Sequence, residues 1–444
     1  MKKVRIGVLG GYRGKTMINW CITNRELADV VAICDMNPDV RDNVRSMLDK
    51  SNYKCTLYEK FDDFLNHDMD AVVLANFANE HAPFAIRCLE RGLHVFSEVL
   101  PCANMKEAVE LCEAVEKYGK IYAYGENYCY FPSMIEMKKE YELGKIGEFE
   151  YGEGEYVHDC ESIWPKITYG DPDHWRNQMS AFFYCTHSAG PIIHVTGLRP
   201  VSVSGFELPY ARRHFEMGAQ NSGAAVEMVT LENGGIFKSL HFNIKGHNTW
   251  YNMYGSRGRM ETGRQGFDKY SIQWLYQWAE QEDKTTDFAF YRPCVGGEPF
   301  EGRFGKVGKR EYRAISDRGQ DAKTSFGHAG SDYYSMENFI KAIVGNESAD
   351  IIGVYEALDM FFVGHFGYLS ALDGNIPKSI PNFRNKEERE PYRNDTSSSI
   401  LASAGDMPLP FSTKEHEKIP ASVYENIRDK YEGKIKEREQ YGKE

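Results

Sequence analysis

A strand that runs directly into a glycine turn and then into a helix is the feature that most restricts the fold of this chain. Residues 4–9 are mostly apolar, and Gly10, Gly11 and Gly14 follow before a helix-like stretch over 15–24. Glycines leave the backbone amides of such a turn open, and the helix N-terminus adds donors and a favourable dipole for a pyrophosphate. The pattern therefore predicts a dinucleotide site at the start of the chain.

An acidic residue at the end of the next strand supports this prediction. The glycine spacing is one residue shorter than the usual Gly-x-Gly-x-x-Gly pattern, but a strand-like segment over 29–34 ends at Asp35, 21 residues after Gly14. A carboxylate there can accept hydrogen bonds from the adenosine ribose and repels a 2′-phosphate, which favours NAD over NADP. The alternative is that the glycines only make a tight turn and Asp35 only ends a strand. The residues expected to line the site are Gly10, Gly11, Tyr12, Arg13, Gly14 and Asp35.

Strand-like and helix-like segments continue to alternate after Asp35. The expected strands are 70–76, 94–98 and 120–124, and the expected helices are 80–91 and 105–118. Such alternation is typical of a parallel, doubly wound sheet, which binds ligands beyond the carboxyl ends of its strands. The residues at these ends, which should lie near the cofactor, are Asn76, Glu98 and the turn Gly125-Glu126-Asn127.

Further along the chain the pattern changes to that of an open, mostly antiparallel sheet. Strand character is found at 148–157, 225–231, 236–242 and 249–254, with turn residues between the strands. We expect helices to cover one face of this sheet and the other face to present residues to the nicotinamide. The predicted fold class is α/β: an N-terminal Rossmann domain with a doubly wound parallel sheet, joined to a C-terminal α/β domain with the open sheet.

Three regions are expected. They are an NAD-binding domain over 1–127, a substrate-binding domain over 128–385 and a C-terminal tail over 386–444 that ends in a short helix and wraps another domain. Within the second domain, the polar, glycine-rich stretch 281–325 is too long for an ordinary connection and is expected to be a lid or a subunit contact.

Composition excludes several classes of function. A net charge of −12 argues against nucleic-acid binding, which needs clustered Lys and Arg to displace counterions. No run of about 18 apolar residues and no signal-like N-terminus is found, so we expect no membrane partner and a cytoplasmic location. The 10 cysteines are scattered without a Cys-x-x-Cys pair, which indicates free thiols and no metal. A small, many-hydroxylated ligand is compatible with this composition.

Taken together, these motifs resemble those of the Gfo/Idh/MocA family, named from glucose-fructose oxidoreductase and inositol dehydrogenase. The resemblance rests on the glycine turn, Asp35, His81 in the run 76–81, and the runs 92–98 and 126–132. It implies an NAD-dependent enzyme that transfers a hydride at a sugar carbinol, at C3 by analogy with the family, with His81 beside the cofactor. The implied substrate is a small-molecule carbohydrate or glycoside. An open sheet with an exposed face also favours a homo-oligomer.

One departure from the family pattern bears on mechanism. Family members commonly carry Glu-Lys-Pro after the fifth strand, and their lysine contacts the reacting sugar hydroxyl, whereas this chain has Glu98-Val99-Leu100-Pro101. Neither Val99 nor Leu100 can transfer a proton, so another group must do so. Similar Glu-Val variants occur in the NAD-dependent α-N-acetylgalactosaminidase branch. That resemblance implies a glycosidase that works by oxidation, elimination, hydration and reduction with NAD retained. The alternatives are a simple NAD-dependent sugar or polyol dehydrogenase and a non-catalytic sugar or nucleotide sensor.

The segment 183–194 contains the first candidate for the missing proton carrier. Its Thr186-His187-Ser-Ala-Gly190-Pro191 run resembles the same branch, and a helix capped by Thr186 would place His187 in its first turn. Histidine in solution titrates near about pH 6.5, which suits general acid–base catalysis. The alternative is a hydrogen-bonded packing histidine. The further catalytic candidates are Tyr128 and His158.

Aromatic rings beside polar side chains suit a sugar, because its C–H faces stack while its hydroxyls form hydrogen bonds. Such residues gather in the loop after the strand 148–157 and in the run 326–333, which is similar to a Gly-His-Gly-Gly-x-Asp segment of the same relatives. Ordinary surface loops, with His328 capping its own loop, are the alternative. The expected substrate-binding residues are Asp159, Trp164, Trp175, Arg176, Tyr184 and His328.

Overall fold

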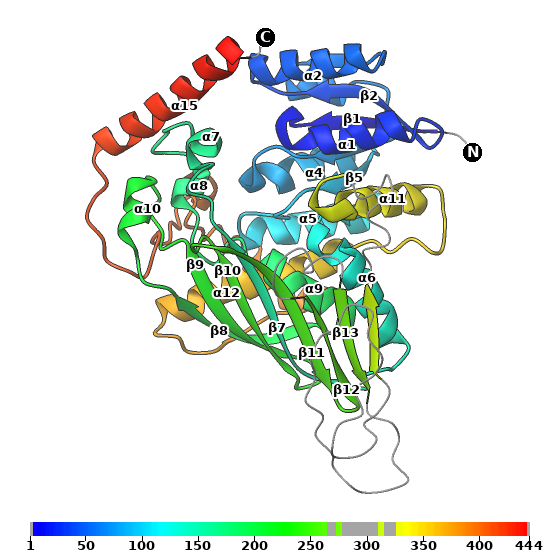
Figure 1. Ribbon diagram of the computed structural model, residues 1–444, viewed down its shortest axis with the longest axis vertical. Coiled ribbons are helices and arrows are strands. Elements are labelled where there is room, and N and C mark those ends of the chain that lie inside the picture. The colour runs from blue at the N-terminus through cyan, green and yellow to red at the C-terminus, as the bar shows by residue number, and fades with distance from the viewer. Residues whose placement is uncertain (1–2, 264–271, 278–309, 315–325, 442–444) are drawn as a thin grey trace, which may run out of the picture.

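The first domain contains a parallel sheet of six strands (Figure 1). The computed structural model describes residues 3–263, 272–277, 310–314 and 326–441. The strands are β1 (Val4–Leu9), β2 (Ala28–Cys34), β3 (Thr56–Tyr58), β4 (Ala71–Leu74), β5 (His94–Ser97) and β6 (Tyr122–Tyr124). Their order is β3-β2-β1-β4-β5-β6, so the winding direction reverses between β1 and β4. Ligands of doubly wound sheets bind at this switch point, beyond the carboxyl ends of the strands.

Five helices follow these strands along the chain, of which the first, fourth and fifth correspond to predicted helices, whereas the second and third, like strand β3, were not predicted. The five helices are α1 (Gly11–Thr23), α2 (Pro38–Lys50), α3 (Phe61–Leu65), α4 (His81–Glu90) and α5 (Met105–Tyr118). Local signals set their ends: the Asn104 side chain accepts a hydrogen bond from the Glu107 amide at the start of α5, and Gly119, with φ of 60°, ends it. The prediction that the first helix starts at Lys15 is wrong. Helix α1 begins at Gly11 because the glycine turn is itself its first turn.

The second domain is built on a nine-stranded sheet of order β14-β13-β12-β11-β7-β10-β9-β8-β15. Its strands are β7 (Phe149–His158), β8 (Pro200–Glu207), β9 (Ala224–Leu231), β10 (Ile236–Phe242), β11 (His247–Gly255), β12 (Gly258–Thr262), β13 (Ile272–Gln277), β14 (Arg310–Ala314) and β15 (Lys378–Ser379). Strands β7 and β10 pair in parallel, and the other described strand pairs of this second sheet are antiparallel. The predicted fold class is therefore confirmed.

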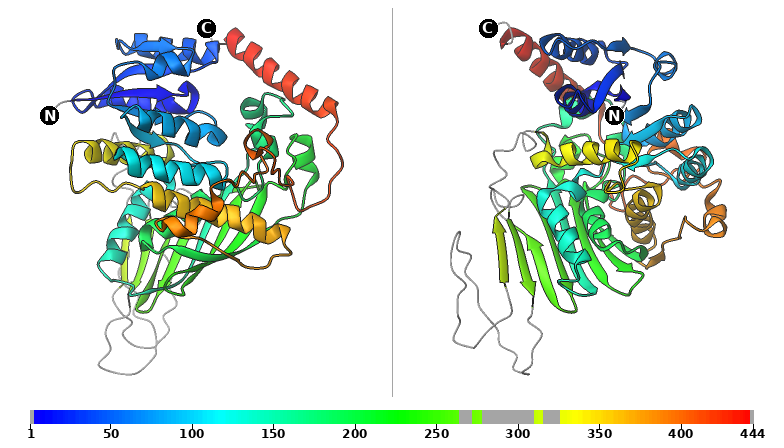
Figure 2. Two further views of the ribbon diagram at one scale, coloured as in Figure 1. Left: turned by 180° about the vertical axis from the view of Figure 1, so that it is seen from behind. Right: turned by 90° about the vertical axis from the view of Figure 1, so that its right-hand side faces the viewer.

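Three helices, α6 (Pro132–Glu142), α9 (Thr186–Thr196) and α12 (Val354–Leu372), cover one face of this sheet (Figures 1 and 2). Helix α9 packs so closely on β7 that a Cβ on Gly154 would lie 2.0 Å from the Ser188 carbonyl oxygen. Because side chains alternate along a strand, Tyr156 and His158 share this helix-covered face with Gly154. Residues of the opposite face include Glu153, which pairs with Lys238.

The remaining described elements lie within the two domains, between them and in the tail. They are η1 (Ala78–Glu80), η2 (Asn127–Tyr130), α7 (Trp164–Thr168), α8 (Trp175–Gln178), α10 (Arg212–Glu216), η6 (His328–Gly330), α11 (Ser331–Ile343), α13 (Lys386–Arg389), η7 (Glu390–Tyr392), α14 (Leu401–Ala404) and α15 (Ala421–Tyr441).

The tail contacts both domains, as expected. The Lys106 amide of α5 donates to the Asp395 carbonyl, and the Asn104 side chain donates to the Ser403 carbonyl. The Ser412 hydroxyl then donates to Glu207 of β8. After these contacts α15 runs back toward α2 of the first domain (Figure 1). The region boundaries 1–127, 128–385 and 386–444 stay predictions.

Some sequence-based expectations concern residues outside the described part of the chain. The stretch 281–325, expected to be a lid or a subunit contact, lies outside it except for β14. Within the described ranges, no helix is both long enough and apolar enough to cross a membrane. The same ranges contain no group of three or more His, Cys, Asp or Glu side chains that could hold a metal ion.

Candidate functional site

The glycine turn at the end of β1 leaves no room for side chains. Gly10 has φ of 92°, and a Cβ there would lie 2.4 Å from the Ala75 carbonyl oxygen. A Cβ on Gly14 would lie 2.5 Å from Val8, so this glycine sets the close packing of α1 on β1. The Gly11 amide donates to Asp35 Oδ2 at 2.8 Å, which ties the turn to the end of β2. These are the features that a dinucleotide turn requires.

Arg13 lies at the centre of a cluster of acidic side chains. It donates to both oxygens of Asp332, at 3.1 and 2.8 Å, and forms a 2.7 Å ion pair with Glu98. Asn127 Nδ2 donates to Asp332 Oδ1 at 2.9 Å, and His328 Nδ1 lies 3.1 Å from Asp332 Oδ2. The cluster therefore joins four predicted site residues to one buried carboxylate.

Asp332 was not among the predicted site residues. Burial raises the pKa of Asp332, but its contacts with His328 and Arg13 hold that pKa well below its usual range. Burial also raises the pKa of Glu98, against the effect of Arg13. The signal in the sequence was the position of Asp332 in the run 326–333, from which only His328 was predicted as a site residue.

His187 forms a short hydrogen bond with Glu126. Its Nδ1 lies 2.6 Å from Glu126 Oε1, and the Glu126 side chain is completely buried. A carboxylate accepts hydrogen bonds, so it favours the tautomer with the proton on Nδ1 and leaves Nε2 as the basic nitrogen. Among the described residues Nε2 has no hydrogen-bond partner. The pair thus has the arrangement of an oriented general base.

The run Thr-His-Ser-Ala-Gly-Pro sets this arrangement locally. Gly190 is needed because a Cβ there would lie 3.0 Å from Cγ of Glu126. Pro191 has no N–H to donate to the His187 carbonyl one turn earlier, and the Tyr251 hydroxyl of β11 donates to that carbonyl at 2.5 Å. The backbone of His187 is therefore fixed by the neighbouring strand.

The expectation that Thr186 caps this helix is wrong. Cys185 is the N-cap residue, without a side-chain hydrogen bond, and Thr186 is the first helical residue. Thr186 is buried, and its Oγ1 accepts a 3.3 Å hydrogen bond from the Tyr124 hydroxyl. Its hydroxyl therefore joins α9 to β6 instead of capping the helix.

Three tyrosine rings surround His187. The centroids of Tyr128, Tyr156 and Tyr184 lie 4.3, 4.6 and 5.3 Å from the imidazole centroid. The Tyr128 ring also lies 6.0 Å from that of His328. Tyr156 was not predicted as a site residue, because nothing in the sequence distinguishes it from the other residues of its strand. Burial raises the pKa of Tyr156 well above the ordinary value. Tyr156 and His187 lie on the helix-covered side of the sheet. The expectation that the other face presents residues to the nicotinamide stays a prediction.

His158 lies next to this cluster on β7. Its ring centroid is 5.8 Å from that of Tyr156, and its Nδ1 is 3.0 Å from Cys160 Sγ. Burial, together with the nearby His247 and His187, lowers the pKa of His158 to about 4. The His158 side chain is therefore neutral at pH 7, and its burial disfavours the protonated form.

The structure brings some of the predicted substrate-binding residues close to His187 and places others away from it. The Arg176 guanidinium lies 4.3 Å from the centroid of Trp175 and 5.6 Å from that of Tyr184, so these three residues adjoin His187 through Tyr184. Trp164 is only 1% exposed, and its Nε1 donates to Asn177, so its ring belongs to the packing of its loop. Asp159 forms a 3.2 Å ion pair with Lys245 at the surface.

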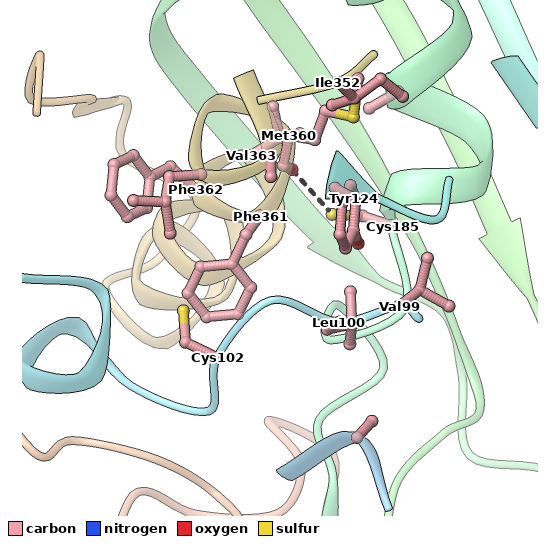
Figure 3. Packing of buried hydrophobic residues seen from close by; sticks show 14 of the residues in the cluster. Val99, Leu100, Cys102, Tyr124, Cys185, Ile352, Met360, Phe361, Phe362 and Val363 are labelled. Carbon is pink, nitrogen blue, oxygen red and sulfur yellow. Dashed lines mark hydrogen bonds between the residues drawn. The ribbon is translucent and has the colours of Figure 1, made fainter. Parts of the chain in front are cut away.

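The segment that replaces the family lysine is apolar in space as well as in sequence. Val99 and Leu100 are buried in the same apolar cluster as Tyr124, Cys185 and Phe361, which Figure 3 shows. The Leu100 carbonyl lies 2.8 Å from Nδ1 of His81, and burial lowers the pKa of that histidine to about 4. The Val99 and Leu100 side chains therefore pack in the loop and offer no group for proton transfer.

Several buried polar atoms near the strand ends remain available to a ligand. Among the described residues, Asn76 Oδ1, Glu126 Oε2 and Asn127 Oδ1 have no hydrogen-bond partner. Asn76 follows β4, whereas Glu126 and Asn127 follow β6. Unsatisfied buried acceptors are costly, and a bound polar ligand would satisfy them. Together with the glycine turn and Asp35, they fit a dinucleotide lying along this edge.

Comparisons with known proteins agree with this geometry. Residues 4–126 match the family described as "Oxidoreductase family, NAD-binding Rossmann fold" (GFO_IDH_MocA), so the first domain binds NAD. The chain is 24% identical over 407 residues to glycosyl hydrolase family 109 protein 1 of Phocaeicola vulgatus, covering 86% of this chain and 84% of that protein.

Two solved structures share the fold. Myo-inositol 2-dehydrogenase from Lactobacillus plantarum has a TM-score of 0.61 and 17% identity, and the match covers 85% of this chain and all of that one. The WlbA dehydrogenase from Bordetella pertussis, solved with NADH and UDP-GlcNAcA, has a TM-score of 0.63 and 18% identity, covering 86% of this chain and 98% of that one. At these identities the likeness concerns the fold.

Proposed function

We propose that this chain, whose residues 4–126 match the Gfo/Idh/MocA oxidoreductase family, is a glycosidase that oxidises its sugar at C3, eliminates the aglycone, adds water and reduces the product. The observation that carries the proposal is the Glu126–His187 pair. It supplies an oriented base in a chain whose Val99 and Leu100 replace the catalytic lysine of the family's dehydrogenases. The similarity to a glycosyl hydrolase family 109 protein over most of both chains favours the same branch.

The cofactor site has the residues that this chemistry needs. We assign the pyrophosphate to the turn at Gly10, Gly11 and Gly14, the adenosine ribose to Asp35, and the nicotinamide end to the region of Asn127. When bound, NAD supplies the redox chemistry, because its nicotinamide accepts a hydride from a carbinol and can return it. Arg13, Glu98 and Asp332 hold the inner wall of this site in place.

His187 is the proposed general base of the first step. With Nδ1–H held by Glu126, Nε2 takes the proton of the C3 hydroxyl as the C3–H bond is broken, and the imidazolium formed is stabilised by the carboxylate. The surrounding tyrosine rings limit the access of water, which strengthens this interaction. At the end of the cycle the imidazolium returns the proton to the C3 oxygen.

The ketone at C3 makes the neighbouring C2–H acidic. A base removes that proton, the electron pair forms the C1–C2 double bond, and the C1–O bond to the aglycone breaks. Water then adds to C1 while a proton returns to C2. We propose that Tyr128 and His158 share these transfers, because both lie in the ring cluster around His187. We place the sugar ring against Trp175, Arg176 and Tyr184.

The test is to incubate the protein with NAD and a panel of aryl glycosides and free sugars while aglycone and NADH are both followed. Aglycone release without net NADH supports the glycosidase. NADH formed in proportion to product, without aglycone, would identify a simple dehydrogenase. If NAD binds but neither aglycone nor NADH is formed, the result would favour a non-catalytic sugar or nucleotide sensor.

Variants test the role of each partner in the pair. His187→Gln should lower kcat by about 10²–10⁴-fold, the usual contribution of general acid–base catalysis, while NAD still binds. Glu126→Gln should lower kcat less and leave KM nearly unchanged, because the imidazolium formed in the first step loses its anionic partner. His67→Gln, in the first domain, is the control. A kcat for Glu126→Gln equal to that of the wild type would rule out the positioning role.

The oligomeric state and compartment stay predictions of a homo-oligomer in the cytoplasm. The side of the second sheet that α6, α9 and α12 leave uncovered is the surface we propose for subunit contact (Figure 2).

A further inference from the structure

The C-terminal helix α15 crosses the edge of the molecule where the NAD site opens. It starts beside the second domain, passes α7 and ends near α2, on the side of the first sheet to which the carboxyl ends of β1 and β2 point (Figures 1 and 2). Those ends carry the glycine turn and Asp35. A segment more than 380 residues away in sequence from Asp35 therefore lies over the adenosine end of the site.

The first half of α15 is fixed to the second domain by close backbone contacts. The Tyr424 hydroxyl donates to the Gly218 carbonyl at 3.1 Å, and Arg428 donates to the Gly170 carbonyl at 3.3 Å. A Cβ on Gly170 would lie 2.5 Å from the Tyr424 carbonyl oxygen and 2.7 Å from the Arg428 amide nitrogen. Tyr424 is buried with Phe215 and Ile419. This half of the helix is thus a built contact.

One turn beyond these anchors, α15 presents Tyr431 to Tyr169. The two ring centroids lie 5.1 Å apart at an interplanar angle of 76°. Burial raises the pKa of Tyr169, and the nearby Tyr431, Tyr12 and Asp35 add to this effect. Burial likewise raises the pKa of Tyr431, with additions from Asp39 and Tyr12. Both phenols therefore lie within electrostatic range of the glycine turn and of the strand end that Asp35 occupies.

Aromatic rings continue from this pair toward the end of β4. The Tyr169 ring is 6.1 Å from that of His174, which is 5.2 Å from the ring of Phe77. Phe77 directly follows Asn76 and is 42% exposed, and Tyr12 in the glycine turn is 61% exposed. Partly exposed aromatic rings beside a ribose-binding carboxylate suit a flat, polar ring system such as adenine.

We propose that α15 closes the adenosine end of the NAD site and that Tyr169 and Tyr431 form the outer wall that retains the dinucleotide between turnovers. This inference rests on the proposed function, since a glycosidase that regenerates NAD in each cycle has no need to release it. In a family of dehydrogenases that exchange their cofactor, such a wall would slow turnover. It is therefore an adaptation to retained NAD, supplied from outside the Rossmann domain.

The test measures NADH dissociation from the full-length protein by fluorescence after dilution into excess NAD, with no glycoside present. Tyr431→Ala should raise the dissociation rate constant about tenfold, which corresponds to about 1.4 kcal/mol. Tyr431→Phe keeps the ring and should behave as wild type. Glu432→Ala removes the exposed neighbouring side chain and is the matched control. Melting temperatures without cofactor should agree among the four proteins.

Equal dissociation rates for the wild type and Tyr431→Ala would overturn the proposal. Equal acceleration by Tyr431→Ala and Glu432→Ala would do the same, because the effect would then not belong to the ring. The dissociation measurement needs no glycoside, so its result can be separated from the result of the glycosidase assay. Slow NADH release without any glycosidase activity would support the role of α15 and contradict the proposed glycosidase. NAD-dependent aglycone release with rapid NADH exchange would support the glycosidase and contradict the role of α15.

Discussion

At the scale of single residues, the carboxylates of this protein fall into two groups. Glu98 and Asp332 are held by Arg13 and serve to fix the inner wall of the cofactor site. Asp35 and Glu126 instead fix loop backbone and a side chain: Asp35 accepts from the Gly11 and Asn37 amides, whereas Glu126 accepts from the Tyr128 amide and bonds to His187. The consequences for binding and stability can be tested one side chain at a time.

Asp35→Asn should change cofactor choice. Loss of the carboxylate removes strong acceptors for the ribose hydroxyls and the repulsion of a 2′-phosphate. We expect NADH to bind about tenfold or more weakly and the preference over NADPH to shrink, as measured by fluorescence titration with both cofactors. Asp42→Asn, an exposed acid on α2, is the control. An unchanged ratio of the two dissociation constants would show that Asp35 does not read the ribose.

His194 should make stability depend on alkaline pH. Burial lowers its pKa, but Glu356 and Asp350 more than offset this and raise it to about 9. Because the folded pKa lies above the solution value, the stabilisation is complete below about pH 6.5 and is lost as pH rises through about 9. Its size is on the order of 2 kcal/mol, reduced by the partial exposure of Asp350. The melting temperature should fall between pH 7 and 10 more steeply in the wild type than in His194→Gln, and parallel curves would contradict this.

At the scale of elements, helix α9 shows how local and long-range constraints combine. Gly190 makes room for Glu126, and Pro191 frees a carbonyl for Tyr251. The helix itself was predictable from its sequence. The prediction that Thr186 is its N-cap is wrong, because the Thr186 hydroxyl bonds to Tyr124 of another element. A capping motif describes only local bonds, and tertiary partners can take the same hydroxyl.

Gly154→Ala should destabilise the protein through the contact between β7 and α9. The added Cβ would meet the Ser188 carbonyl oxygen at 2.0 Å, so the helix must move. We expect a loss of about 1–3 kcal/mol or more in denaturant unfolding, as for overpacked sites, together with reduced kcat because His187 precedes Ser188. Gly353→Ala is the control, since nothing lies within 4 Å of its Cβ position. Equal unfolding midpoints would refute the contact.

At the scale of the whole molecule, the tail joins both domains. Arg389 is only 1% exposed and donates to both oxygens of Glu116 on α5 at 2.8 Å. The nearby Arg393 makes similar contacts with Glu113 at a more exposed position. The same tail then supplies α15 to the edge of the NAD site, so its attachment bears on both stability and cofactor binding.

Arg389→Ala should cost about 3 kcal/mol of unfolding free energy, because Glu116 keeps its charge in a partly buried place without its partner. Arg393→Ala should cost less than about 1 kcal/mol, as expected for an exposed pair. The free energies of unfolding of the two variants and the wild type are compared by urea denaturation. Similar small losses in both would show that the buried pair does not hold the tail.

Much of the first domain could be read from the sequence. Periodicity, the glycine turn and Asp35 are local signals, and they predicted a parallel sheet that binds NAD, with five of its six strands and three of its helices, but not β3, α2 or α3. The apolar Val99 and Leu100 likewise marked the missing lysine before their buried places were known. The strands 225–231 and 236–242 of the second sheet were predicted for the same reason, since alternation and a turn are local.

Only the tertiary structure decided which side chains meet. His187 and Glu126 are 61 residues apart, and Arg13 and Asp332 are 319 apart, so no spacing rule joins them. Tyr156 and Tyr431 carry no distinguishing local pattern and enter the site through the pairing of β7 and the course of the tail. Local sequence determines which elements form, whereas the packing of those elements, which depends on burial of their apolar faces over the whole chain, determines where their polar residues converge.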